Sequence, residues 1–127
     1  MKRSVLYEAH ALAGQELLEY RRNKAKRAAH TLRGDRRANA EAWASAIESV
    51  RALLAAEMPE KERAMTRLFG LDAPIPRRQQ VHARMIHLSN ELHISEQTLY
   101  KWRDDILRLV VCAAVEAGVI RPFGIGK

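Results

Sequence analysis

Two short apolar stripes separated by a tight corner constrain this chain more than any other feature of its sequence. The first stripe has helical steps of four, three and four, and consists of Val81, Met85, Leu88 and Leu92. The second stripe has the same kind of spacing and consists of Leu99, Trp102, Ile106 and Val110. Ser95 stands between them, where its hydroxyl can accept a free backbone N–H at the start of the second helix. The spacing predicts two helices joined by three or four residues.

The corner itself has the residue types of a helix-turn-helix. Ser89 is a small residue at the point where the two helices would touch, and Leu92 and Ile94 are apolar on either side of His93. His93 occupies a position that glycine usually takes, but histidine is enriched among the non-glycine residues with positive φ. The pattern favours a helix-turn-helix whose second helix enters the major groove of DNA. The alternative is an ordinary helical hairpin with a serine cap.

Helix geometry selects the residues that would contact DNA. If the second stripe faces the core, the opposite side of the first two turns is free to reach base edges. The predicted base-reading residues are Glu96, Gln97, Tyr100 and Lys101. The predicted phosphate contacts are Ser95, Thr98, Arg103, Arg77, Arg78 and Arg84. Asp104 and Asp105 would repel phosphates, so only the start of this helix is expected in the groove. Arg108 is expected to pair with Asp104.

The rest of the sequence predicts an all-α fold. Gly and Pro are few, with six and four residues, and no strand-like alternation is present. Helices are expected from Ser4 to about Leu32, from Arg36 or Asn39 to Met58, and from Pro59 to Phe69, with Gly70 as the residue after the third. The helix after Ser95 is long and is expected to reach Glu116 or Ala117 before Gly118. A stripe of Trp43, Ile47, Val50, Leu54 and Met58 marks either core or a dimer seam.

This pattern suggests a helical N-terminal part followed by a C-terminal helix-turn-helix domain with a long recognition helix. The expected division is an N-terminal helical arm and dimerisation region over 1–58, a DNA-binding domain over 59–120 and a flexible tail over 121–127.

The charge is uneven along the chain. The formal net charge is +7 over 127 residues, which suggests a polyanionic partner. The run RRNKAKR is a candidate basic arm and contains Arg21, Arg22, Lys24, Lys26 and Arg27. Either these side chains contact phosphates, or they form a solvated face of a frayed helix.

The sequence contains no pattern typical of a metal site or of a catalytic site. The five histidines show no metal-ligand spacing, and no phosphate loop, nucleophile elbow or paired-carboxylate arrangement occurs. Cys112 lies in an apolar run and is expected to be a buried small hydrophobe. One cysteine, no apolar stretch of membrane-spanning length and no signal-peptide block favour a cytoplasmic protein. We therefore expect no enzyme, no cofactor, no metal, no small-molecule substrate and no membrane contact.

The segment LHISEQTLYKWRDDIL resembles the C-terminal helix-turn-helix of the phage transcriptional regulators called ArpU or RinA proteins. MPEKERAMTRLFGLD is similar to the helix that precedes this motif in region 4 of sigma factors, and ALAGQELLEYRRNKAKRA is similar to the regulators' N-terminal helix. The resemblance implies a DNA-binding regulator of late phage or prophage genes. A homodimer on double-stranded DNA is expected, since one helix-turn-helix reads few base pairs. RNA polymerase is a further candidate partner.

Two other functions fit the same pattern. One is a phage DNA-packaging protein of the small-terminase type, which is also helical but works as a ring. The other is a helical interaction protein that uses the stripe from Trp43 to Met58 and does not bind DNA.

Overall fold

Five α-helices form the part of the chain that the computed structural model describes, which is residues 5–29, 34–75 and 81–119. In chain order they are α1 (Val5–Ala28), α2 (Gly34–Glu57), α3 (Pro59–Phe69), α4 (Val81–Leu92) and α5 (Glu96–Glu116). No strand occurs in these ranges. The all-α prediction is confirmed.

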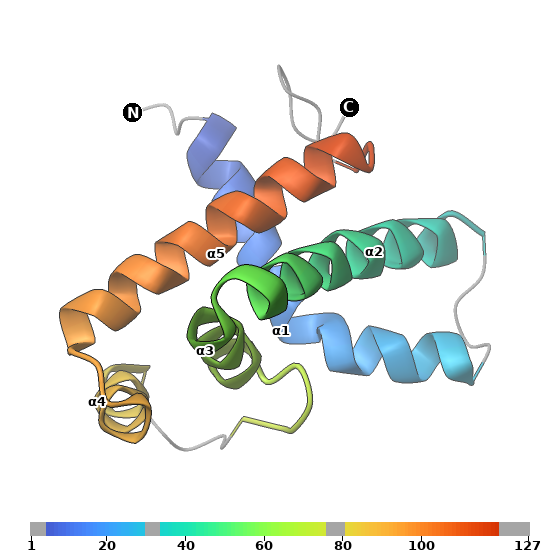
Figure 1. The fold of residues 1–127 in the computed structure, drawn as a ribbon. Helices are drawn as coiled ribbons and strands as arrows, with labels where there is room; N and C mark the ends of the chain where they lie inside the picture. Colours follow the sequence, from blue (N-terminus) through green and yellow to red (C-terminus); the bar gives the residue numbers. More distant parts are fainter. Residues whose placement is uncertain (1–4, 30–33, 76–80, 120–127) are drawn as a thin grey trace.

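Helices α2 and α5 form the centre of the fold. They pack against each other, α3 joins them from one side, and α4 contacts α3 and α5 (Figure 1). Helix α1 changes direction along its length, so that its first part crosses behind α5 and its second part runs beside α2 (Figure 1). The crossing is close because the residues there are small: Ala9 and Ala13 are buried, and a Cβ at Gly14 would lie 3.7 Å from Leu107 Cδ2.

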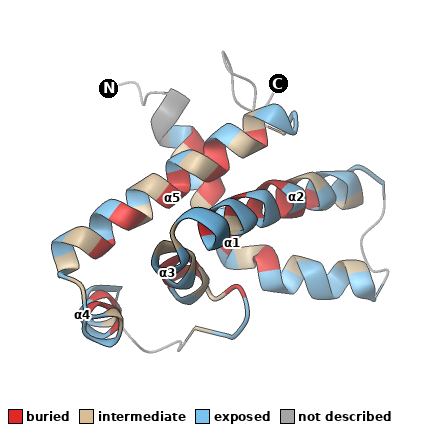
Figure 2. Cartoon of the chain, in the orientation of Figure 1, coloured by how far each residue is buried: buried red, intermediate tan, exposed pale blue. Residues whose placement is uncertain are grey.

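One hydrophobic core draws on all five helices (Figure 2). Its largest fully buried side chains are Leu17, Ile47, Met65, Leu68, Met85, Leu99, Ile106 and Val110. Burying a side chain of this size contributes about 1.5–3 kcal/mol, so these residues dominate the stability of the fold. The core is continuous across residue 58, and the packing shows no break at the expected boundary between arm and domain.

The stripe on α2 belongs to this core. Trp43, Ile47, Val50 and Leu54 are all buried, and the helix packs on α5 and α3 within the same chain. Of the two sequence interpretations, core and dimer seam, the structure selects the core. The stripe is therefore not an exposed surface for a partner, as the alternative of an interaction protein requires.

The ends of α3 and α5 lie where the sequence places them. Pro59 is the first residue of α3, and Gly70 follows it in the left-handed region with φ 62°. The backbone N–H of Leu71 then donates to the carbonyl of Thr66 at 3.1 Å. Gly118 plays the same part after α5, with φ 82°. Glycine suits both positions because it has no Cβ to clash there.

Arg51 on α2 holds α3 and the loop after it. One guanidinium nitrogen lies 3.0 Å from Asp72 Oδ2, 3.3 Å from Thr66 Oγ1 and 3.5 Å from Glu62 Oε1. These contacts fix α3 against α2. Helix α4 in turn packs on α3, so Arg51 also helps to fix the helix that α4 contacts.

Candidate nucleic-acid interface

The corner between α4 and α5 is built from local hydrogen bonds. After α4, the N–H of His93 donates to Asn90 O at 3.3 Å, and the N–H of Ile94 donates to Ser89 O at 3.0 Å. This pair of bonds is a Schellman motif, and His93 occupies its left-handed position with φ 57°. His93 thus takes the role that glycine has at residues 70 and 118, as its sequence position predicts.

Ser95 caps α5 as predicted. Its backbone is extended, and its Oγ accepts the N–H of Thr98 at 3.0 Å. The Ser95 hydroxyl also donates to Thr98 Oγ1 at 2.8 Å. The cap fixes the direction in which α5 leaves the corner, and Glu96 in the first turn places a carboxylate near the positive end of the helix dipole.

The two helices meet at a small residue. Ser89 is 4 % exposed, and its hydroxyl donates to the carbonyl of Ile86 at 2.8 Å, so the buried oxygen is satisfied. Leu88 on α4 and Leu99 on α5 are buried in the same core. Trp102 follows at 8 % exposure, which confirms the predicted phase of the inward face of α5.

Two contacts to α3 hold α4 in place. Arg67 forms a forked ion pair with Glu91, in which Nη2 lies 3.0 Å from Oε1 and Nη1 binds Oε2. Arg84 Nη2 donates to the carbonyl of Leu68 at 2.7 Å. The position of α4 relative to α5 is therefore fixed through α3 as well as through the corner itself.

The start of α5 presents three of the four predicted base-reading side chains to solvent. Gln97 and Lys101 are exposed, and Tyr100 is 41 % exposed. Glu96 differs, because it is half-buried and its Oε1 is buried without a hydrogen-bond partner. The structure brings Gln97, Tyr100 and Lys101 together as one exposed group and places Glu96 on the inner side of the helix.

The predicted phosphate contacts fall into three groups. Ser95 and Thr98 bond to each other in the cap. Arg84 and Arg103 are half-buried neighbours on α4 and α5, and burial, followed by repulsion from Arg103, lowers the pKa of Arg84. An arginine remains protonated at neutral pH, so two positive charges face each other here. Arg77 and Arg78 lie outside the described residues.

The acidic residues of α5 have separate environments. Asp105 Oδ2 lies 3.1 Å from Lys61 Nζ of α3, and the same ammonium stands 5.9 Å from the centre of the Trp102 ring. Asp104 and Arg108 are both exposed. The ion pair expected between these two does not occur among the contacts of the described residues. Arg108 is therefore an exposed cation two turns beyond Lys101 on the same side of the helix.

The candidate basic arm lies at the other end of the molecule. The arm is the last part of α1, which lies at the same end of the fold as the start of α2, whereas the start of α5 lies on the far side of the fold (Figure 1). Arg21, Arg22, Lys24 and Lys26 are exposed, and Arg27 is half-buried. Arg36 and Arg37 extend the cluster onto α2, where Arg37 Nε donates to Glu41 Oε1 at 2.9 Å. We call these seven residues the basic tip.

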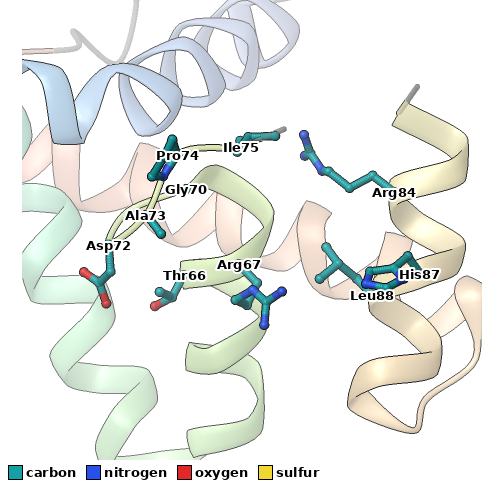
Figure 3. Close-up of a pocket in the computed structure, with 10 residues that line it drawn as sticks. All are labelled: Thr66, Arg67, Gly70, Asp72, Ala73, Pro74, Ile75, Arg84, His87 and Leu88. Carbon is teal, nitrogen blue, oxygen red and sulfur yellow. The ribbon is translucent and has the colours of Figure 1, made fainter. Parts of the chain in front are cut away.

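A hollow opens between α3, the loop after it and α4 (Figure 3). It has a volume of about 850 Å³, and its lining includes Gly70, Ile75, Arg84 and His87. No sequence signal marked it, since its walls come from segments with no shared motif. The chain between Ile75 and α4 lies outside the described residues, and no ligand is assigned to this opening.

Cys112 corrects one sequence expectation. It is exposed, although it lies in the apolar run that contains Val110, Val111 and Ala114. At 100° per residue, Cys112 stands about 160° from Val110 around the helix, so the core that covers Val110 leaves it in solvent. Periodicity, and not the apolar composition of the run, decides its burial.

Within residues 5–29, 34–75 and 81–119 no group of three or more His, Cys, Asp or Glu side chains is placed to hold a metal ion. Over the same residues, no helix combines the length and the apolar character that a membrane crossing requires.

Comparison with known proteins gives no function for this chain, so the function is inferred from the geometry of the site. The resemblance to phage regulators rests on three sequence segments, and it stays a prediction. No family model, no curated protein and no solved structure matches the chain.

Proposed function

We propose that this chain binds duplex DNA in a sequence-specific manner, with the first two turns of α5 in the major groove, and acts as a transcriptional regulator. The observation that supports this most is the group of Gln97, Tyr100 and Lys101, exposed together at the start of a serine-capped helix that leaves a tight corner. A recognition helix needs both features, because its N-terminal residues must reach base edges while a preceding helix crosses the backbone.

The chemistry of the three side chains fits base recognition. The amide of Gln97 can bond both N6 and N7 of adenine, and the ammonium of Lys101 can bond O6 and N7 of guanine. Tyr100 can contact a phosphate or the methyl group of thymine. Glu96 is a weaker candidate than its neighbours, because half of its carboxylate faces the protein.

Arg84 and Arg103 support the proposal from the side of the corner. Two half-buried guanidinium groups repel each other, and Arg84 Nε is buried with no hydrogen-bond partner among the described residues. A phosphate oxygen beside them would offset the repulsion between the two guanidinium groups. These two arginines are thus proposed to fix the position of α5 on the duplex.

The regulatory role and the homodimer go beyond this geometry. The resemblance to phage regulators suggests the first, and the few base pairs that one helix can read suggest the second. Sedimentation of the purified chain tests the assembly. Two copies per particle agree with a dimeric regulator, whereas a ring of eight or more copies favours the packaging alternative.

The experiment that tests DNA recognition is selection of bound sequences from a pool of random duplexes at two salt concentrations. We expect one enriched motif. Lys101→Ala should weaken binding to that motif by about 1–3 kcal/mol and relax the preference at one position. Arg108→Ala is the matched control, since it removes the same charge from the same side of α5 beyond the proposed groove contact.

Two results would contradict the proposal. One is binding without any enriched sequence, lost steeply as salt rises, which would leave only electrostatic attraction. The other is an equal loss of binding in Lys101→Ala and Arg108→Ala, because the start of α5 would then have no special role.

A further inference from the structure

The positive charge of this protein is concentrated at one place, and that place is not the start of α5. Residues 21–37 contain eight Lys or Arg and one acidic residue, so they have a net charge of +7. The whole chain also has +7, which means that the remaining 110 residues sum to zero. Residues 81–116, which contain α4 and α5, have four bases and five acids, a net charge of −1.

The structure keeps this charge exposed and at one end of the fold. Arg21, Arg22 and Lys24 on α1 and Arg36 on α2 are all exposed, and the last part of α1 lies at the same end of the fold as the start of α2 (Figure 1). Arg37 is partly neutralised by its ion pair with Glu41, and Asp35 is the one acidic residue of the segment. Arg33 also belongs to the charged segment but lies outside the described residues.

Helix stability does not explain the cluster. Lys26 and Arg27 lie in the last turn of α1, where cations favour the helix dipole. Arg21 and Lys24 lie earlier, and each is three residues from the next cation along the same face, a spacing at which like charges destabilise a helix. A polyanion bound to the tip would remove this repulsion.

The residue types between the basic residues favour phosphates over a membrane as the partner. A helix that lies on a membrane combines basic residues with large apolar ones, which enter the lipid. Residues 21–28 have alanine as their one apolar residue type. Arginine and lysine without such apolar neighbours suit the regular phosphates of a duplex.

We propose that the basic tip is a second contact for the phosphate backbone of duplex DNA, separate from α5, so that one chain can hold two duplex segments. The start of α5 and the tip lie at opposite ends of the molecule (Figure 1). The holding of two segments rests on the proposed function of α5, whereas the phosphate contact of the tip does not. The tip supplies sequence-independent affinity in addition to the phosphate contacts proposed for Arg84 and Arg103 in the near-neutral α4–α5 region.

A matched pair of variants tests the phosphate contact. R21Q/K24Q removes two exposed charges from the tip, and R63Q/R108Q removes two exposed charges elsewhere, on α3 and late in α5. Binding of the full chain to a short duplex of random sequence is measured by fluorescence anisotropy across a salt series. We expect R21Q/K24Q to reduce the slope of log K against log salt by up to about 1.8, at about 0.9 per lost phosphate contact. R63Q/R108Q should change it by less than half as much. Equal slopes in the two variants, or an unchanged slope in R21Q/K24Q, would overturn the proposal.

A capture experiment tests the second segment. An immobilised duplex with the selected motif is saturated with protein, and a labelled duplex without the motif is then added. We expect the wild type and R63Q/R108Q to retain the labelled duplex, and R21Q/K24Q to lose most of it while staying on the immobilised one. Retention by R21Q/K24Q equal to that of the wild type would overturn the bridging role. If no motif exists, the proposed function of α5 fails, but the salt series on random duplexes still decides the role of the tip.

Glutamine is used in these variants because it removes the charge and is expected to keep the fold. It is a good helix former, and all four substituted side chains are exposed. Circular dichroism and the melting temperature confirm folding before binding is measured.

Discussion

The α4–α5 corner and the basic tip differ in what holds them and in what they offer to a partner. The corner is fixed by a Schellman motif, a serine cap and the contacts of Glu91 and Arg84 to α3, and it has little net charge. The tip is the far end of two helices, with the net charge of the whole chain on mostly exposed side chains. Defined shape and electrostatic attraction are therefore located in different segments of this protein.

The largest expected effect tests whether the corner depends on the common core. Trp102→Ala removes a buried indole from α5, and we expect a loss of about 3–5 kcal/mol in the free energy of unfolding. The melting temperature should fall by on the order of 10–20 °C. Lys101→Ala, one residue earlier and exposed, should change stability by less than about 0.5 kcal/mol. An unchanged melting temperature in Trp102→Ala would mean that the corner does not depend on the common core.

The next effect concerns the base of the tip, where Tyr20 joins α1 to α2. Its hydroxyl donates to Glu48 Oε2 at 2.7 Å. Burial, and then the bond to Glu48, raise the pKa of Tyr20 from 10.0 to about 12. The unfolded chain therefore loses this proton first as pH rises, and this contribution to stability is present below pH 10 and lost towards pH 12. The loss is at most about 2.7 kcal/mol.

Comparison with Tyr20→Phe isolates this group from the lysines that titrate in the same range. Denaturant unfolding of both proteins is measured from pH 8 to pH 11.5. At pH 8 the wild type should be the more stable by about 0.5–1.5 kcal/mol, the usual value of one hydrogen bond. The difference should shrink as pH rises. A constant difference over the whole range would mean that the pKa of Tyr20 is not raised in the folded protein.

A third prediction concerns the local bonds of the corner. Ser95→Ala removes the oxygen that accepts the N–H of Thr98, so we expect a loss of about 0.5–2 kcal/mol in the free energy of unfolding. Ser95→Asp keeps an acceptor and is the matched control, with stability close to the wild type. Chemical denaturation of the three proteins measures the effect. Equal stability of the alanine and aspartate variants would show that the cap contributes nothing.

The smallest expected effect is a change in the free energy of unfolding whose sign is opposite in the two regions. Lys24→Gln at the tip removes like-charge neighbours three residues away on both sides, and should raise the free energy of unfolding by about 0.4–1 kcal/mol at low salt. Lys101→Gln makes the same exchange on α5, where Asp104 and Asp105 follow at three and four residues, and should lower it by a few tenths of a kcal/mol. Thermal melts at low and high salt measure both. A loss of stability in Lys24→Gln would mean that the tip is not under repulsion.

The sequence by itself determined the ends of α3 and α5 and the corner between α4 and α5. Pro59, Gly70, Ser95 and Gly118 act within one turn of their own helix, so their effect does not depend on the rest of the fold. The same holds for His93, whose positive φ follows from its place between Leu92 and Ile94. The inward phase of Trp102 also followed from spacing alone, because a helix fixes which residues share a face.

Only the tertiary structure decided which faces are covered and where the two regions lie. It showed that the stripe from Trp43 to Leu54 is core and not a seam, that Glu96 turns inward, and that Cys112 is exposed. It also placed the basic tip away from the start of α5. Burial depends on which other helix arrives at a face, and that is set by contacts between residues far apart in the chain. The local sequence pattern therefore does not predict those contacts.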